Sequence, residues 1–497
     1  MKTNDEILRR RDMRDVLTFT IDPASAKDYD DALSFAVLDD DTYQVGVHIA
    51  DVTYYVKPGS KEDNDAYDRG TSVYLVDRVL PMLPERLCND LCSLRENEDK
   101  LCLSVVFNLT HDARVVKYKV CRTVIRSDYR LTYEQAQNMI EECKMQDAKC
   151  KMQNAEYKMQ NAECKMQNAE GEMRGGMDEE LWTAIRELNF LALVLRRQRM
   201  ANGALEIEQD EPHFVLDENG HPVDIYYGKS TESHHLIEEF MLLANRTIAT
   251  AMAKHVMVYR VHDKPDPYKI AALERFKKKM GERVLPQTLD LLLVRAMAKA
   301  VYSTCNIGHY GLAFDYYTHF TSPIRRYPDM MVHRLVSKYL LGERGYEQIA
   351  PGVSVDNLED LEQACGHCSD MEQYATQAER DSVKLYHALW MADHVGEEHE
   401  GVIVSVTEYG LFVQLPDTHS EGLVPIRTIC PGHYLELDEK NFCLRTKSKP
   451  KVRRGWTAET EFPIEDRCYM LGDKVRVKIV RVDLEKAQVE FELVNDN

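Results

Sequence analysis

Four aspartates stand within ten positions in the stretch FTIDPASAKDYDDALSF, residues 19–35. They are Asp22, Asp28, Asp30 and Asp31. The apolar run before them is typical of a strand, so we expect them in a loop at a sheet edge. Carboxylates this close repel one another unless a cation lies among them, and Mg²⁺ prefers such oxygens together with waters and phosphate oxygens. The pattern favours a Mg²⁺ site. A plain acidic loop is the alternative. A calcium-binding EF-hand does not fit, because this stretch lacks the Gly and the Glu that an EF-hand loop requires.

A second set of polar residues lies in HFTSPIRRYPD, residues 319–329. The prolines predict a stiff turn that leads into a helix near Asp329, with Arg325 and Arg326 just before its N-terminus. Backbone N–H groups and guanidinium groups at such a place suit a phosphate. The alternative is an arginine pair that binds structural carboxylates. A metal site and a phosphate clamp in one chain indicate phosphoryl-transfer chemistry.

The elements that position these residues are mixed. Strands are predicted at 16–21, 43–56, 102–109 and 117–125, and helices at 234–256, 288–303, 329–342 and 357–394. The fold class is therefore α+β (mixed) over residues 1–395. From 396 to 497 short alternating strands, with a turn at Tyr409–Gly410, predict a small all-β OB-fold barrel.

The barrel region carries a basic run, KSKPKVRRGW, at 447–456. With Tyr409 and Phe412 on neighbouring strands, it would offer stacking faces beside a positive groove, which suits single-stranded nucleic acid. A solvated loop is the alternative.

Residues 144–171 are four copies of a heptad, KMQDAKC KMQNAEY KMQNAEC KMQNAEG. Met and Ala recur three and four positions apart, which forms a narrow apolar stripe on a helix. A partner-binding coiled coil and a solvent-exposed helical arm both fit, and the poor packing of Ala favours the arm.

Composition excludes few classes of protein. The net charge is −20, from 63 basic and 83 acidic residues, which argues against polyanion binding overall but says little about the field in one groove. The 13 cysteines, the absence of a signal peptide and the lack of long apolar runs predict free thiols in a cytoplasmic protein with no membrane span. Cys365 and Cys368 resemble half a zinc site, but two buried thiols on a helix are favoured.

Four longer motifs carry a family resemblance: TIDPASAKDYDDALSF, GVHIADVTYYVKPGS, RGTSVYLVDRVLPMLPERLC and HFTSPIRRYPDMMVHRL. Over nearly the whole chain they resemble the ribonuclease II/ribonuclease R family, closest to its bacterial ribonuclease R branch. The resemblance implies an RNB catalytic domain and an OB-fold RNA-binding domain. It also implies Mg²⁺-dependent, processive 3′→5′ hydrolysis of single-stranded RNA to 5′-mononucleotides.

The resemblance also implies roles for single residues. Asp22 and Asp31 would bind the metal directly and Asp28 through water, while Asp30 would be closest to the chemistry. Arg325 would steady the scissile phosphate beside Glu379. The remaining residues match substrate contacts: Tyr74 packs on the 3′-terminal nucleotide, and Tyr133 and Glu238 contact bases and ribose deeper in the channel.

Further expectations concern partners and extent. We expect single-stranded RNA as the partner, with the ribosome or other RNA-decay factors as further candidates, no membrane, and a monomer. Ribonuclease R proteins carry cold-shock-type domains before the catalytic body, and this chain opens directly on that body. A non-catalytic RNA-binding protein with a nuclease-like body is therefore the alternative function, and a metal-dependent endonuclease is a third.

Deleting residues 144–171 is expected to leave folding and catalysis nearly intact, because a stripe of Met and Ala buries little apolar area. Thermal melting and light scattering test this. A large fall in melting temperature, or a new oligomeric state, would show that the heptads pack on another surface.

Overall fold

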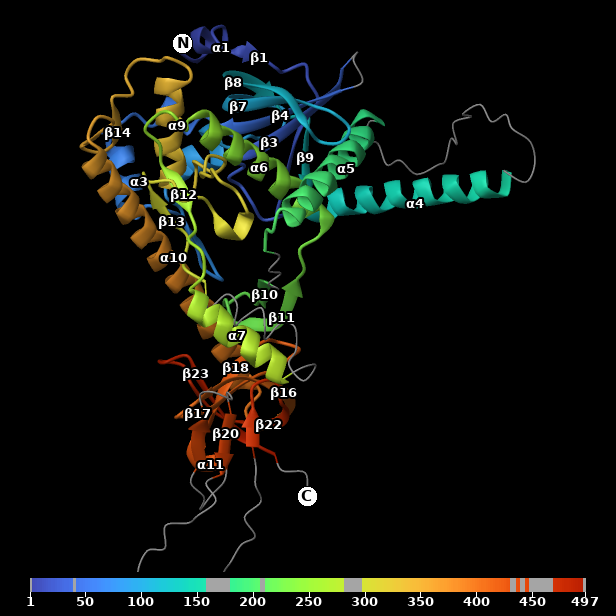
Figure 1. The fold of residues 1–497 in the computed structure, drawn as a ribbon, viewed down its shortest axis with the longest axis vertical. Coiled ribbons are helices and arrows are strands. Elements are labelled where there is room, and N and C mark those ends of the chain that lie inside the picture. Colours follow the sequence, from blue (N-terminus) through green and yellow to red (C-terminus); the bar gives the residue numbers. More distant parts are fainter. Residues whose placement is uncertain are drawn as a thin grey trace, which may run out of the picture.

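The computed structural model describes residues 2–38, 42–157, 179–205, 211–280, 297–429, 435–438, 443–446 and 468–494. The prediction for the basic run at 447–456 lies outside these residues, as does the heptad segment 158–171. Helix α4 (Tyr133–Tyr157) begins in the body and carries the first heptads away from it (Figure 1).

A seven-stranded mixed sheet forms the centre of the N-terminal body (Figure 1). Its strands in spatial order are β1 (Arg11–Asp12), β8 (Val115–Arg126), β7 (Asp99–Leu109), β4 (Tyr43–Ala50), β3 (Asp31–Val37), β2 (Thr18–Asp22) and β9 (Tyr129–Thr132). The central strands β4 and β7 are buried along almost their whole length, which explains their nearly continuous apolar sequences. Strand β2 pairs antiparallel with β3 and parallel with β9, so its end lies between those two strands.

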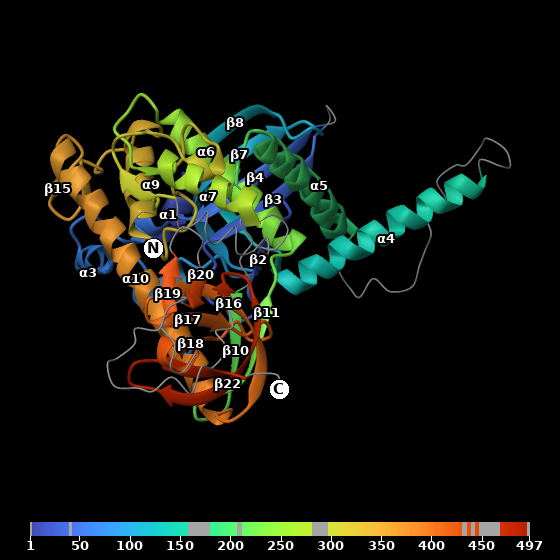
Figure 2. The same ribbon diagram turned by 60° about the horizontal axis from the view of Figure 1, so that its bottom comes forward.

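Helices lie around this sheet (Figures 1 and 2). They are α1 (Lys2–Ile7), α2 (Val52–Tyr55), α3 (Lys61–Arg69), α5 (Glu179–Ala201), α6 (Glu232–Ala251), α9 (Tyr327–Tyr339) and α10 (Leu358–Asp393). Helix α7 (Pro267–Met280) lies apart from the sheet, on the side of the C-terminal region (Figure 1). Helix α10 has 36 residues, roughly 50 Å of helix, and runs from the side of the body to the C-terminal region. A continuous hydrophobic core extends from Met13 to Cys368.

Short hairpins complete the body. They are β5 (Val73–Tyr74) with β6 (Val79–Leu80), β10 (Glu211–Leu216) with β11 (Pro222–Gly228), β12 (Tyr259–Val261) with β13 (Val301–Ser303), and β14 (Gln348–Ala350) with β15 (Val353–Ser354). Two predictions were partly wrong here. The strand expected at 43–56 ends at Ala50 and is followed by α2. Of the helix expected at 288–303, residues 288–296 lie outside the described residues, and the last three residues instead form β13, which pairs with Tyr259–Val261.

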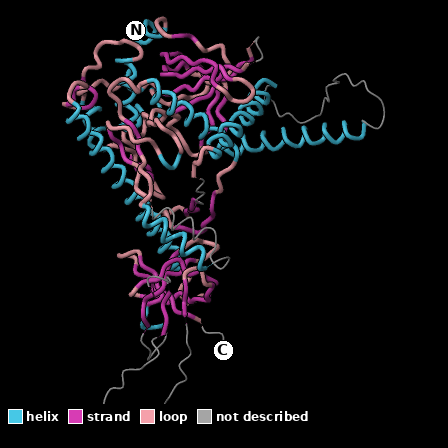
Figure 3. The backbone as a smooth tube through the Cα atoms, in the orientation of Figure 1, coloured by secondary structure: helices cyan, strands magenta, loops and turns pink. Residues whose placement is uncertain are grey.

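The C-terminal region is rich in strands (Figure 3) and has its own hydrophobic core, from Ala388 to Phe491. Five strands form its barrel in the order β16 (Glu398–Thr407), β17 (Gly410–Gln414), β18 (Glu421–Pro425), β23 (Gln488–Leu493) and β22 (Lys474–Asp483). The seam between β18 and β23 is thin, with one paired position, Leu423–Glu490. Smaller elements beside it are α11 (Ile426–Ile429), β19 (Leu435–Asp438), β20 (Cys443–Thr446) and β21 (Cys468–Met470). The mixed fold with an all-β OB-type C-terminal region is confirmed.

The cysteine pair of α10 is buried, and both Cys365 and Cys368 are free thiols. Within the described ranges, no group of three or more His, Cys, Asp or Glu side chains is arranged as a metal site. No described helix is long and apolar enough to span a bilayer.

A polar network lies inside the sheet. The ring of His48 on β4 is fully buried, and its two nitrogens lie 2.8 Å from the hydroxyls of Ser34 on β3 and Ser104 on β7. Gly46 leaves the room for this contact, since a Cβ there would lie 2.4 Å from both His48 Nε2 and Ser34 Oγ.

Gly46→Ala is therefore expected to lower the free energy of unfolding by about 1–3 kcal/mol through overpacking. Gly366→Ala is the matched control: it lies on the exposed face of α10 with nothing near its Cβ position. That variant is expected to gain about 0.5–1 kcal/mol from helix propensity. Urea unfolding measures both, and equal shifts would contradict close packing around His48.

Candidate active site

The predicted aspartate cluster forms where β2 and β3 separate. Asp22 is the last residue of β2 and Asp31 the first of β3, and Asp28 and Asp30 lie in the loop between them. The two strands pair only at Thr18–Ser34 and Phe19–Leu33, so they are unpaired at the end that carries the carboxylates. The separation lets several carboxylates share one region.

Asp30 connects this loop to a distant turn. Its side chain is 6% exposed, its Oδ1 accepts a hydrogen bond from the Ile324 amide at 2.9 Å, and its Oδ2 lies 3.6 Å from Arg325 Nε. Burial raises the pKa of Asp30 well above its usual range, and the Arg325 charge opposes that shift. The carboxylate is thus held in place from two sides by residues almost 300 positions away in the chain.

Asp22 and Asp31 have the chemistry of metal ligands. Burial, with the neighbouring Asp31 next, raises the pKa of Asp22 to about 7, and burial raises the pKa of Asp31 to about 6. Asp22 Oδ2 is buried without a hydrogen-bond partner among the described residues. An orphaned carboxylate oxygen beside a second carboxylate fits a hard divalent cation, which takes one or two carboxylates and completes its shell with water and substrate oxygens.

The two arginines of the predicted phosphate clamp are separated in the structure. The Arg325 side chain is 44% exposed and faces Asp30. Arg326 is the residue before α9 and turns inward, where its Nη2 donates to Asp329 Oδ1 at 2.8 Å. The same Asp329 oxygen accepts from the Ser322 amide, so this pair stabilises the turn itself. Arg325 alone is placed as the sequence analysis expected.

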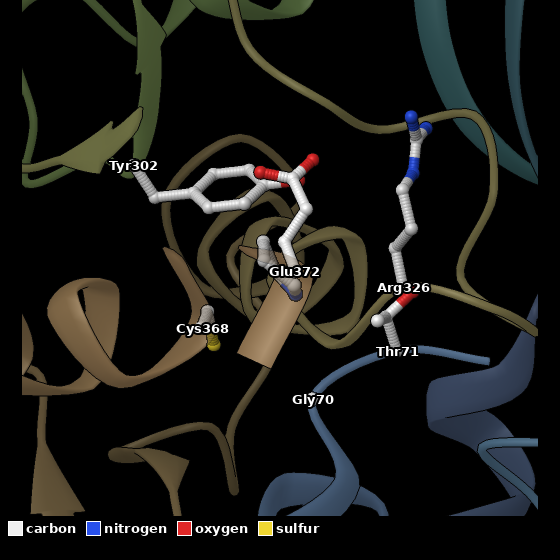
Figure 4. Close-up of a pocket in the computed structure, with 7 residues that line it drawn as sticks. Gly70, Thr71, Tyr302, Arg326, Cys368 and Glu372 are labelled. Carbon is white, nitrogen blue, oxygen red and sulfur yellow. The ribbon is translucent and has the colours of Figure 1, made fainter. Parts of the chain in front are cut away.

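Arg326 also lines a small cavity of about 10 Å³, room for about one water molecule (Figure 4). The other lining residues are Gly70, Thr71, Tyr302, Pro328, Cys368 and Glu372. The cavity is too small for a nucleotide, so it is a gap in the packing beside the turn before α9 and not a substrate site.

Tyr74 and Glu379 are joined to the same turn. The Thr71 hydroxyl and the Ser72 amide both donate to the Arg325 carbonyl at 2.9 Å. Two residues on, the Tyr74 amide donates to Glu379 Oε1 on α10, also at 2.9 Å. The segment from Thr71 to Tyr74 therefore connects α10 with the arginine turn.

Thr71 and Ser72 were missed as site residues by sequence reasoning. Their contacts to Arg325 use one hydroxyl, one backbone amide and a carbonyl, for which residue type gives no signal. Only their place in the motif RGTSVYLVD, next to Tyr74, could have drawn attention to them.

Tyr133, but not Glu238, lies close to the aspartates. Tyr133 follows β9 directly, and its hydroxyl pKa is raised by burial and then by the charges of Asp31 and Asp22. Its ring stacks on His234 of α6, with centroids 3.9 Å apart and planes 10° apart. Glu238, one turn further along α6, instead contacts α5.

The Glu238 carboxylate is 42% exposed and pairs with Arg199 Nη2 at 3.1 Å and Arg196 Nη1 at 3.5 Å. Arg199 also binds the buried Glu239. No described contact joins Glu238 to the aspartate loop, so its predicted ribose contact stays a prediction.

Comparison with known proteins agrees with this geometry. Residues 10–342 match the model of the RNB domain, and residues 393–440 match that of the S1 RNA binding domain. The chain is 38% identical over 521 aligned positions to ribonuclease R of Thermotoga maritima, covering 99% of this chain and 66% of that relative. The chain thus spans less than two thirds of that relative's length.

Solved structures share the fold. RNase R of Mycoplasma genitalium, solved in complex with ribose methylated single-stranded RNA, has a TM-score of 0.81 at 24% identity, covering 99% of this chain and 73% of that one. A yeast pseudonuclease has a TM-score of 0.66 at 20% identity, covering 90% of this chain and 54% of that one. The fold alone therefore does not decide activity, and the side chains of the site must.

The raised pKa of Asp22 predicts that the free energy of unfolding depends on pH. Because its folded-state pKa of about 7 lies above its ordinary 3.8, the folded metal-free protein binds the extra proton, and stability falls as pH rises through that window. At about pH 8 without metal, Asp22→Asn is expected to raise the free energy of unfolding by roughly 1–3 kcal/mol.

The gain should shrink at about pH 5, where Asp22 itself is protonated. Mg²⁺ should raise the melting temperature of the wild type more than that of the variant. Asp68→Asn, at an exposed position on α3, is the control. A variant that is less stable than the wild type at both pH values would contradict this account.

Proposed function

The chain belongs to the RNB family, which includes ribonuclease R, and we propose that it is a Mg²⁺-dependent 3′→5′ exoribonuclease. It would hydrolyse single-stranded RNA processively to 5′-mononucleotides. The observation that carries the proposal is the contact of Asp30 with the turn at 324–325. That contact brings a carboxylate cluster and a half-exposed guanidinium together at one point.

Asp22 and Asp31 are proposed to hold the cation directly and Asp28 to hold it through water. Their support is the buried orphan oxygen of Asp22 and the proximity of Asp31. When bound, a divalent cation polarises the phosphate and makes an attacking water more acidic. The protein's part is to hold these carboxylates close together, and the bound cation would favour their ionised forms.

Arg325 is proposed to stabilise the charge that develops on the scissile phosphate. Its backbone is fixed by Thr71 and Ser72, while its side chain stays 44% exposed and free to meet a phosphate. A preorganised cation needs no reorganisation during the reaction, and that gives it its catalytic effect. Asp30 is proposed to orient the Arg325 side chain through its Oδ2 and to be the carboxylate nearest to the scissile phosphate.

The 3′-terminal nucleotide of the RNA is proposed to pack on Tyr74, and a base deeper in the channel is proposed to stack on Tyr133. Tyr74 is 40% exposed and fixed through Glu379, which would place its ring against the terminal base. Tyr133 offers its second face, because the first is covered by His234. A ribose contact from Glu238 would supply the preference for RNA through the 2′-hydroxyl.

We propose a division into a catalytic domain, residues 1–395 with an insertion at 144–171, and an RNA-binding OB-fold domain, residues 396–497. The two separate hydrophobic cores support a boundary in the last turns of α10. The single-stranded RNA named for the Mycoplasma relative supports the same substrate class here.

End-labelled single-stranded RNA incubated with Mg²⁺ tests the proposal. A label at the 5′ end should stay on long RNA that shortens from the 3′ end, while a 3′ label should appear at once as mononucleotide. Internal fragments would indicate an endonuclease. Binding without hydrolysis would favour the non-catalytic RNA-binding protein.

Variants connect the assay to the site. Arg325→Ala is expected to lower turnover by roughly a hundredfold or more, the scale of one lost transition-state contact. Asp30→Asn should fall below about a tenth of wild-type activity, with RNA binding retained in both variants. Arg95→Ala, an exposed arginine paired with Asp90, is the control and should keep full activity.

A further inference from the structure

Two side chains outside the loop that carries the aspartates, Ser93 and Arg130, bind the backbone of that loop. Ser93 holds the later half: its hydroxyl donates to the Lys27 carbonyl at 2.8 Å and accepts from the Tyr29 amide at 3.0 Å, on either side of Asp28. Arg130 holds the first half. Neither residue carried any chemical signal in the sequence.

Arg130 reaches the loop from β9. It is aligned with Thr20 of β2, two positions before the pair Asp22–Thr132. Its Nη2 donates to the Ala24 carbonyl at 2.9 Å and to the Pro23 carbonyl at 3.3 Å. The guanidinium also lies over the Tyr29 ring, 5.3 Å from its centroid. One side chain thus contacts both ends of the loop.

Two roles are open to such a group. As a charge, Arg130 lies close enough to Asp22 to favour its ionised form. As a clamp, it holds the backbone of Pro23 and Ala24, which follow Asp22, close to Tyr29, which follows Asp28. The hydrogen bonds to two successive carbonyls and the ring contact depend on the planar guanidinium, which a lysine cannot reproduce.

We propose that Arg130 is a positioning residue for the metal site: it holds Pro23 and Ala24 against Tyr29 so that Asp22 and Asp28 face one divalent cation. The inference rests on the proposed function, since the cation is the one proposed there. It adds a residue that touches neither cation nor RNA.

The two roles differ in the sign of one measurement. Removing a positive charge near the site, by itself, would strengthen cation binding. Removing a clamp would weaken it. Mn²⁺ as a probe for Mg²⁺, followed through the EPR signal of the free ion with no RNA present, gives the dissociation constant directly.

Arg130→Gln and Arg130→Lys are both expected to weaken Mn²⁺ binding by about tenfold, about 1.4 kcal/mol. Arg95→Gln is the matched control, because Arg95 also lies near Tyr29 but binds Asp90. It should leave the dissociation constant unchanged. In hydrolysis, the Arg130 variants should recover much of their kcat at high Mg²⁺, with the KM for RNA little changed.

Unchanged or tighter Mn²⁺ binding by Arg130→Gln would overturn the proposal. Mn²⁺ binding by Arg130→Lys with the wild-type dissociation constant would also overturn it, because the charge of Arg130 would then be sufficient. Circular dichroism checks that both variants fold, and if the glutamine variant does not, the lysine variant decides alone. A wild type that binds no Mn²⁺ also overturns the inference. Degradation of RNA is scored separately, so an inactive wild type with Arg130-dependent Mn²⁺ binding would refute only the exoribonuclease.

Discussion

The aspartates lie where β2 and β3 separate, and their carboxylates repel one another. Two unit charges 4 Å apart at an effective dielectric of about 20 interact by about 4 kcal/mol. Burial favours the protonated forms of Asp22 and Asp31, and the guanidinium groups of Arg325 and Arg130 offset part of the negative charge. Arg325 faces Asp30 and Arg130 lies on the side of Asp22. A cation that binds here replaces a repulsion that the protein otherwise carries in its interior.

The turn at 322–327 transmits this constraint to the rest of the body. Its amides and carbonyls bind Asp30, Ser72 and Gly70, so it cannot move without displacing the segment from Gly70 to Tyr74. Behind it, Tyr327 and Arg334 on α9 both bind the buried Asp63 of α3, at 2.8 and 2.6 Å. Loss of one partner of such a buried pair leaves an uncompensated charge and costs about 3–5 kcal/mol, so the pair keeps α3 against the helix that follows Arg325.

The sequence identified the charged residues of the site but not their supports. The aspartates and Arg325 are visible because four acids in ten positions and an Arg pair before a helix are unusual in composition. Arg130 is invisible, because it acts through backbone carbonyls of Pro23 and Ala24 that any residue possesses. The direction of Arg326 could not be predicted for a related reason: neighbouring residues in a turn point in different directions, and only the position of Asp329 reveals which one turns inward.

The net charge of −20 describes the whole chain and does not determine the field at one site. On β22, Lys478 stands opposite Glu398 and Arg476 opposite Glu400, so each of these basic residues faces an acidic residue of β16. Attraction of a polyanion then depends on local positions where a guanidinium group stays exposed to solvent and its charge is only partly compensated. Arg325 meets that condition, 44% exposed and 3.6 Å from a carboxylate that it only partly compensates. A phosphate that arrives with its own cation would satisfy both the arginine and the aspartates, whereas a cation alone would satisfy only the aspartates.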